Sequence, residues 1–194
     1  MNNKTNFLKS KEEINKYFNN FLPVRFNKLL EEYNISIIDF DFSNIKLNNC
    51  ESQKLDGVIF IQNDAINIYY NSNKDIKEQR FIIATLIGYL QNIKSNKNEE
   101  NTIKDYYINF ITDDIFNNNK PYNKIAREIL LPKDSFEKIF LLLKTIYKEE
   151  WVINILSNKF EVPESEIVLG IKDLGYDLDI DINNDKTKKI LYKD

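Results

Sequence analysis

The sequence predicts an α+β fold, in which a small antiparallel β-sheet of about three strands packs on a mostly helical body. Two observations lead to this prediction. Residues 35–70 contain three short runs that alternate or concentrate β-branched and aromatic residues, as strands do. Most other apolar residues recur at helical spacing before and after that region. The hydrophobic share of 42%, with 13% aromatic residues, is sufficient for a globular core.

The first part of the chain contains the predicted strands. We expect residues 1–10 to form a flexible tail and residues 11–33 to be helical, because their apolar positions recur at helical spacing. Residues 35–42 alternate apolar and polar side chains, which indicates a strand with one face toward solvent. Residues 57–61 and 65–70 are two further strands joined by a short polar turn, which predicts a hairpin.

The most apolar element is a helix predicted over residues 75–94. Its centre has almost no polar face, and a helix of this kind is buried inside a fold. Thr85 and Tyr89 are the polar exceptions, and their i, i+4 spacing places them on one side of the helix. Ser72 or Asn73 is expected to cap the N-terminus of this helix.

The remainder of the chain is predicted to be mainly helical. The aromatic-rich segment over residues 103–116 has an apolar stripe at helical spacing, which predicts a helix. An alternating run over residues 176–182 is compatible with a short final strand. Between them, helices are expected over residues 122–131, from residue 134 or 135 onward, over 151–160 and over 164–174.

We expect an α+β domain over residues 11–150, followed by a helix pair and tail over residues 151–194 that pack on the same core. The net charge of -3 provides no general attraction to phosphate backbones, so we do not expect a nucleic acid as a partner. No apolar run reaches the roughly 18–20 residues of a membrane span, so no membrane partner is expected. Cys50 is the only cysteine, which excludes an intramolecular disulfide and suggests a cytoplasmic location.

The absence of histidine removes several classes of catalytic site. The chain has neither imidazole metal ligands nor a Ser-His-Asp triad, and its 4 glycines form no phosphate-binding loop. Two carboxylate clusters could bind Mg²⁺, namely Glu99, Glu100 and Asp105, or Asp113 and Asp114. They lie in or beside polar linkers, where solvated side chains are the simpler interpretation. We therefore expect no catalytic residue, no metal and no cofactor.

Four short motifs occur in a fixed order along the sequence. The central one is Arg80-Phe81-x-x-Ala84-x-x-x-Gly88. The others are Asp56-Gly57 with residues 66–70, residues 125–132, and Phe160-x-Val162 with Ile167, Ile171 and Leu174-Gly175. In this order they resemble the ImmA/IrrE family of zinc metallopeptidase domains, whose active helix has the pattern R-F-x-x-A-H-E-x-G-H. The resemblance covers most of residues 12–175 and implies a zincin-like body with a small helix-turn-helix-like end.

The chain departs from this family at each position that would carry the chemistry. The resemblance places Thr85 and Tyr89 at the two histidines, Leu86 at the catalytic glutamate and Asn119 at the third metal ligand. Zinc requires three basic ligands and an activated water, which these side chains do not supply. The resemblance therefore implies a catalytically inactive scaffold, whose remnant cleft of Thr85, Leu86, Tyr89 and Asn119 binds another protein or an extended peptide. Without the resemblance, Thr85 and Tyr89 are structural residues of the helix.

Such a protein is expected to act in a phage, mobile-element or regulatory system, with a peptide held by strand addition along residues 66–70. A metal-dependent hydrolase with a non-standard carboxylate site is one alternative. Another is a DNA-associated transcriptional regulator that uses the helix pair over residues 151–174, although Glu164, Glu166 and Asp173 have the wrong charge for this. A structural or oligomerising protein is the third.

Overall fold

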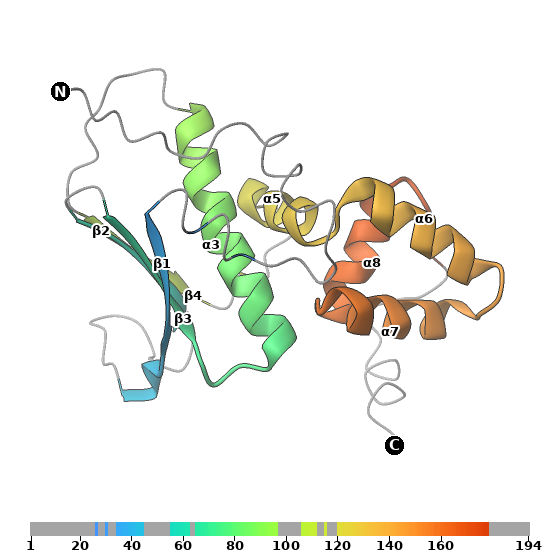
Figure 1. The fold of residues 1–194 in the computed structure, drawn as a ribbon, viewed down its shortest axis with the longest axis horizontal. Helices are drawn as coiled ribbons and strands as arrows, with labels where there is room; N and C mark the ends of the chain where they lie inside the picture. Colours follow the sequence, from blue (N-terminus) through green and yellow to red (C-terminus); the bar gives the residue numbers. More distant parts are fainter. Residues whose placement is uncertain are drawn as a thin grey trace.

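The computed structural model of this chain describes residues 26, 30, 34–44, 55–62, 65–96, 106–111, 115 and 120–178. The α+β class is confirmed: a four-stranded sheet carries a long helix on one face, and shorter helices follow it (Figure 1). The elements are β1 (Ile35–Phe40), the 3-10 helix η1 (Phe42–Asn44), β2 (Leu55–Gln62), β3 (Ala65–Asn71), α3 (Ile76–Asn96), β4 (Tyr106–Ile111), α5 (Pro121–Leu130), α6 (Lys133–Lys144), α7 (Glu149–Phe160) and α8 (Glu164–Asp173). The predicted tail over residues 1–10 and most of the predicted helix over 11–33 lie outside the described residues.

The sheet is mixed and has four described strands, so the prediction of a small antiparallel sheet of about three strands is wrong in these two details. Its strand order is β1-β3-β2-β4. The predicted hairpin is confirmed, since β2 and β3 pair antiparallel with Ile59 opposite Ile68. β1 pairs with β3 in parallel, with Ile37 opposite Ile68. Alternation along a strand indicates which side chains face the core, but it does not specify the neighbouring strand.

The strand β4 occupies part of the segment over residues 103–116 that was predicted to be helical. It pairs antiparallel with β2, with Ile108 opposite Ile59, and the register shifts between Leu55 and Gly57. The apolar residues of this segment satisfy both periodicities, because residues 106 and 110 are one helical turn apart while 106, 108 and 110 alternate. Aromatic and β-branched residues favour strands, and pairing with β2 decides between the two.

The helix α3 covers one face of the sheet and supplies the centre of the hydrophobic core (Figure 1). Phe81, Ile82 and Ile87 have no exposed surface, and they belong to the same core as Ile59 and Ile68 of the sheet. The prediction of a buried helix over residues 75–94 is therefore confirmed. Within the described ranges, no helix has both the length and the apolar character that crossing a membrane requires.

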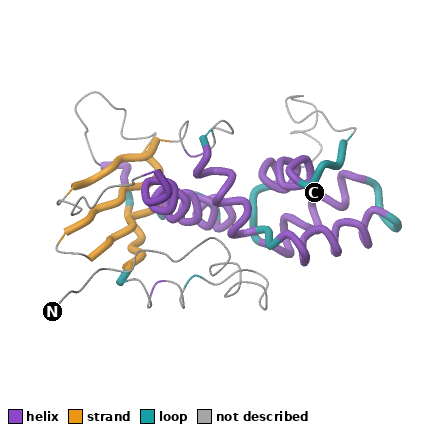
Figure 2. The backbone as a smooth tube through the Cα atoms, turned by 90° about the horizontal axis from the view of Figure 1, so that it is seen from above, coloured by secondary structure: helices purple, strands orange, loops and turns teal. Residues whose placement is uncertain are grey.

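The helices α6, α7 and α8 form a group at the opposite end of the molecule from the sheet, with α5 between this group and α3 (Figures 1 and 2). We call this group the helical lobe. Phe136 of α6 and Phe160 of α7 pack edge to face in its interior, with ring centroids 5.4 Å apart. The predicted domain boundary between residues 150 and 151 falls inside α7. The described part of the alternating run, residues 176–178, is not a strand.

Candidate functional site

Asp75 fixes the beginning of α3, the helix that carries the predicted site. Its Oδ1 accepts hydrogen bonds from the backbone N–H groups of Lys77 (2.8 Å) and Glu78 (3.0 Å), so Asp75 is the N-cap. The prediction of Ser72 or Asn73 as the cap is wrong, because the helix begins directly after Asp75. Burial, and then the neighbouring Asp75, raise the pKa of the Glu78 carboxyl group.

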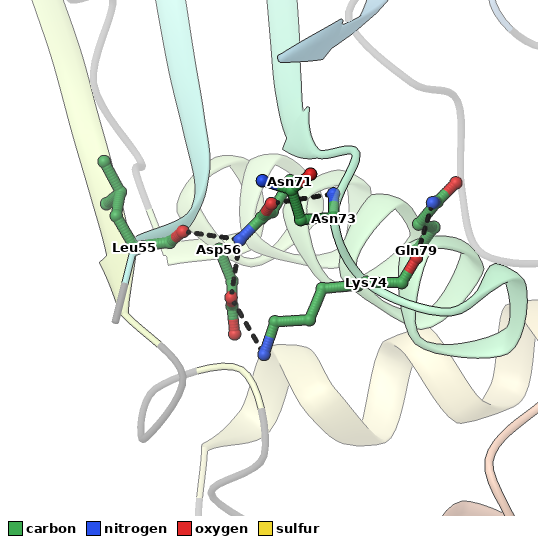
Figure 3. A network of polar contacts seen from close by, with 6 residues as sticks. All are labelled: Leu55, Asp56, Asn71, Asn73, Lys74 and Gln79. Atoms are coloured by element: carbon green, nitrogen blue, oxygen red, sulfur yellow. Dashed lines mark hydrogen bonds and ion pairs between the residues drawn. The ribbon is translucent and has the colours of Figure 1, made fainter. Parts of the chain in front are cut away.

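A second polar arrangement joins the start of β2 to the turn before α3 (Figure 3). Asn71 Nδ2 donates to the Leu55 carbonyl (3.2 Å) and to Asp56 Oδ1 (3.5 Å), and Asn71 Oδ1 accepts from the Asn73 N–H (3.0 Å). Lys74 Nζ lies 3.2 Å from Asp56 Oδ1. This network connects two strands with the turn that precedes α3, and it therefore helps to orient α3 against the sheet.

Asp56 is the buried carboxylate of this network, and its side chain has no exposed surface. Its Oδ1 is paired, whereas the buried Oδ2 has no hydrogen-bond partner among the described residues. One carboxylate beside an amine does not make a metal site. In the part of the chain that the structure describes, no group of three or more His, Cys, Asp or Glu side chains could hold an ion. We interpret Asp56 as a structural anchor at the register shift of β2.

Thr85 and Leu86, two residues of the predicted remnant cleft, are enclosed in the core. Neither has any exposed surface, and the Thr85 hydroxyl has no hydrogen-bond partner among the described residues. Leu86 packs against Gly57 of β2, because a Cβ atom placed on Gly57 would lie 2.8 Å from Leu86 Cδ1. Residue 86 therefore fills the space between helix and sheet, and a ligand in solution does not reach it.

Tyr89 is the partly accessible residue of the predicted cleft. Its ring packs edge to face on Tyr122 of α5, with centroids 5.4 Å apart. Gly88 permits this close crossing of α3 and α5, since a Cβ atom there would lie 2.5 Å from the Tyr122 carbonyl oxygen. Burial raises the pKa of the Tyr89 phenol. At neutral pH the hydroxyl is therefore a hydrogen-bonding group and not a base.

The rest of the predicted binding mode is not supported by the fold. Asn119 lies outside the described residues. Strand addition along residues 66–70 is contradicted, because β3 is an interior strand that pairs with β1 on one side and β2 on the other. An interior strand has no free row of backbone groups to offer a peptide. Among the described strands, the edges of the sheet are β1 and β4.

Two basic residues of α3 connect it to the helical lobe. Arg80 Nε donates to the Glu161 carbonyl (3.2 Å) and lies 3.4 Å from the Glu161 carboxylate, just after α7. Lys77 Nζ donates to Ser157 Oγ (2.9 Å) and Asn158 Oδ1 (2.7 Å) on α7. Burial lowers the pKa of Arg80, while the charge of Glu161 opposes this shift. The arginine of the family-like motif therefore has a structural role in this chain.

A buried charge cluster between α5 and α8 was not anticipated from the sequence. Arg127 Nη1 lies 3.2 Å from Glu166 Oε2, and Arg127 Nε lies 2.9 Å from Asp173 Oδ2. Glu166 is only 2% exposed, and burial raises its pKa to about 7 although Arg127 acts in the opposite direction. The feature of the sequence that could have indicated this cluster is the i, i+7 spacing of Glu166 and Asp173, with Gly170 between them. This spacing aligns the two acids on one face of α8.

The helix α8 presents little positive charge to a nucleic acid. Glu166 and Asp173 pair with Arg127, and Glu164 accepts a hydrogen bond from Asn154 Nδ2 (3.1 Å). Lys172 is the only Lys or Arg of this helix. A helix that enters the major groove usually carries several such residues, so the geometry does not favour the DNA-binding alternative.

No protein-family model and no curated protein sequence matches this chain.

Proposed function

We propose that this protein is a peptidase-like scaffold without peptidase chemistry, which acts by binding another protein. The observation that carries the proposal is the burial of Thr85 and Leu86, the positions that the family resemblance assigns to a metal ligand and a general base. Metal-dependent peptide hydrolysis requires these positions to face a cleft that substrate and water can enter. In this chain Leu86 instead packs α3 against β2, which supports a role through contact.

The edge of β1 is the proposed binding position for an extended segment of the partner. β3 is the only strand that pairs with β1 among the described residues, so the other side of β1 can accept a peptide by strand addition. Phe40, at the end of β1, is 37% exposed. Its ring centroid lies 4.9 Å from that of Phe42 and 6.1 Å from that of Tyr69. Phe40 therefore offers apolar contact area beside the edge, and the buried Phe42, which is 2% exposed, supports its ring from below.

The proposed setting is a phage, mobile-element or regulatory system, as the family resemblance suggests. The proposal also places the protein in the cytoplasm, because a lone cysteine suits a reducing compartment. No cofactor is part of the proposal.

Metal analysis combined with a cleavage assay tests the loss of chemistry. The protein, incubated with equimolar Zn²⁺ and then dialysed, is expected to retain far less than one zinc per chain and to leave casein intact. Tyr89→Phe removes the partly accessible hydroxyl of α3, and Tyr147→Phe is the matched control in the helical lobe. One tightly bound zinc per chain, with cleavage that Tyr89→Phe reduces and Tyr147→Phe does not, would overturn the proposal.

A further inference from the structure

Exposed apolar side chains gather at the far end of the helical lobe. Seven large hydrophobic side chains are exposed in the described part of the chain, and five of them lie at the end of α6, in the turn that follows it and at the start of α7. Figure 1 shows this turn at the end of the molecule farthest from the sheet. We call these five residues, which are 42–65% exposed, the α6–α7 tip: Leu141, Leu142, Ile146, Tyr147 and Trp151.

Local hydrogen bonds hold the α6–α7 tip in a defined shape. The N–H groups of Ile146 (3.0 Å) and Tyr147 (2.9 Å) donate to the Leu143 carbonyl, and Thr145 Oγ1 donates to the Leu142 carbonyl (2.7 Å). A patch that is already ordered loses less conformational entropy when a partner covers it. The tip is therefore suited to specific docking.

The size of the patch is sufficient for contact between two copies of the chain. An aromatic side chain offers about 150–250 Å² of surface, so five large side chains at this exposure present on the order of 500 Å² of apolar surface. Two such patches in contact bury on the order of 1,000 Å², which reaches the lower limit for a specific interface.

The charges around the α6–α7 tip are self-complementary. Lys148 directly precedes Glu149 and Glu150, and Lys144 lies four residues before Lys148, so the two positive and two negative charges of this turn cancel. A turn of this kind does not select a strongly acidic or basic partner. When two identical patches meet about a twofold axis, the exposed Lys148 of each copy can face the exposed Glu150 of the other.

We propose that the α6–α7 tip is a dimerisation surface, at which a second copy of this chain docks about a twofold axis. Trp151 and Ile146 supply the apolar centre of the contact, and Lys148 and Glu150 set its orientation. The inference goes beyond the proposed function, because it concerns a surface remote from α3 and does not depend on the loss of catalysis.

The molar mass in solution tests this proposal directly. Sedimentation velocity and light scattering over about 1–100 µM are expected to show a monomer–dimer equilibrium. The Ile146→Glu and Trp151→Glu double variant is expected to weaken dimerisation at least tenfold, because it places carboxylates in the apolar centre. Ile76→Glu is the matched control, since Ile76 is 60% exposed, close to the 65% of Ile146, but lies at the start of α3. This control is expected to leave the equilibrium unchanged.

A charge exchange tests the twofold arrangement without altering the apolar centre. Lys148→Glu is expected to weaken the dimer by a few-fold, because it sets two carboxylates against each other, and adding Glu150→Lys is expected to restore it. A monomer at all concentrations would overturn the proposal, as would a dimer that the double variant leaves intact. Monomers that sediment with anionic phospholipid vesicles through Trp151 would assign the tip to a membrane and would equally overturn it. None of these results alters the zinc content or the cleavage assay that test the proposed function.

Discussion

The helices α3 and α6 use their apolar residues in opposite ways. α3 lies between the sheet and α5, and Phe81 and Leu86 on it have no exposed surface. α6 packs its buried face against α7 and places Phe136 near Gly170 of α8, whereas Leu141 and Leu142 near its end are 42% and 62% exposed. The centre of the helix suggested by the family resemblance is therefore enclosed in the core, whereas the exposed apolar surface lies on helices where no motif pointed.

Replacing one leucine of each helix by glutamate is expected to give the largest difference in the free energy of unfolding. Leu86→Glu is expected to lower the free energy of unfolding by on the order of 5 kcal/mol, because it buries a carboxylate against Gly57. Leu142→Glu is expected to change it by about 0.5 kcal/mol or less, since residue 142 faces water. Urea unfolding followed by circular dichroism measures both. A small cost at residue 86 would show that α3 is not enclosed.

The next largest effect is expected where the helical lobe is joined to α5. Arg127→Met leaves Glu166 buried without its partner, so the free energy of unfolding should fall by about 3–5 kcal/mol at pH 8. Arg80→Met, on α3, is the matched control with a smaller expected loss, because its partner Glu161 is 41% exposed and retains water. Equal losses in urea unfolding would contradict the expectation that the buried pair of Arg127 contributes more to stability than the exposed pair of Arg80.

The same cluster makes the stability of the lobe depend on pH. The folded-state pKa of Glu166 is raised from 4.5 to about 7, so the folded protein holds this proton more tightly than the unfolded chain. This tighter proton binding by Glu166 stabilises the folded protein fully below pH 4.5. The stabilisation, on the order of 3 kcal/mol of unfolding free energy, is lost as the pH rises through about 7.

Urea unfolding between pH 4.5 and 8 measures this loss. Glu166→Gln should remove the slope, and Glu164→Gln, at a more exposed position of the same helix, should keep it. An unchanged slope in Glu166→Gln would assign the pH dependence to another group.

The smallest expected effect concerns how the two helices begin. Asp75→Ala removes the side chain that caps α3 and should cost about 1 kcal/mol of unfolding free energy. α6 has no side-chain cap, and Asp134 lies in its first turn, where its charge is favourable to the helix dipole, so Asp134→Ala should cost about 0.3–0.5 kcal/mol. Thermal unfolding of the two variants compares them, and the reverse order would contradict the assigned cap.

Local periodicity predicted the elements whose stability depends on nearby residues. The β2–β3 hairpin and the helices α3, α5, α7 and α8 were identified because their apolar residues repeat with one clear period. β4 was not identified, because its aromatic residues fit both periods and its strand form depends on pairing with β2. The parallel pairing of β1 with β3 joins segments about 30 residues apart, which alternation cannot specify.

The sequence predicted on which helix the candidate site residues lie, but not whether solvent reaches them. The spacing placed Thr85 and Tyr89 on one side of α3, but their exposure depends on what packs over them. The structure encloses Thr85 and leaves Tyr89 partly open beside Tyr122. The charge of Glu166 counts against DNA binding but does not predict its burial, which depends on an arginine 39 residues away on another helix.

By itself, the sequence determined the α+β class, the apolar character of α3 and the lack of imidazole chemistry, because composition and local spacing do not change with the fold. Only the tertiary structure decided the order of the strands, the contact of Leu86 with Gly57 and the exposure of the α6–α7 tip. Each of these depends on which distant segments pack together, and side-chain burial is a property of that packing.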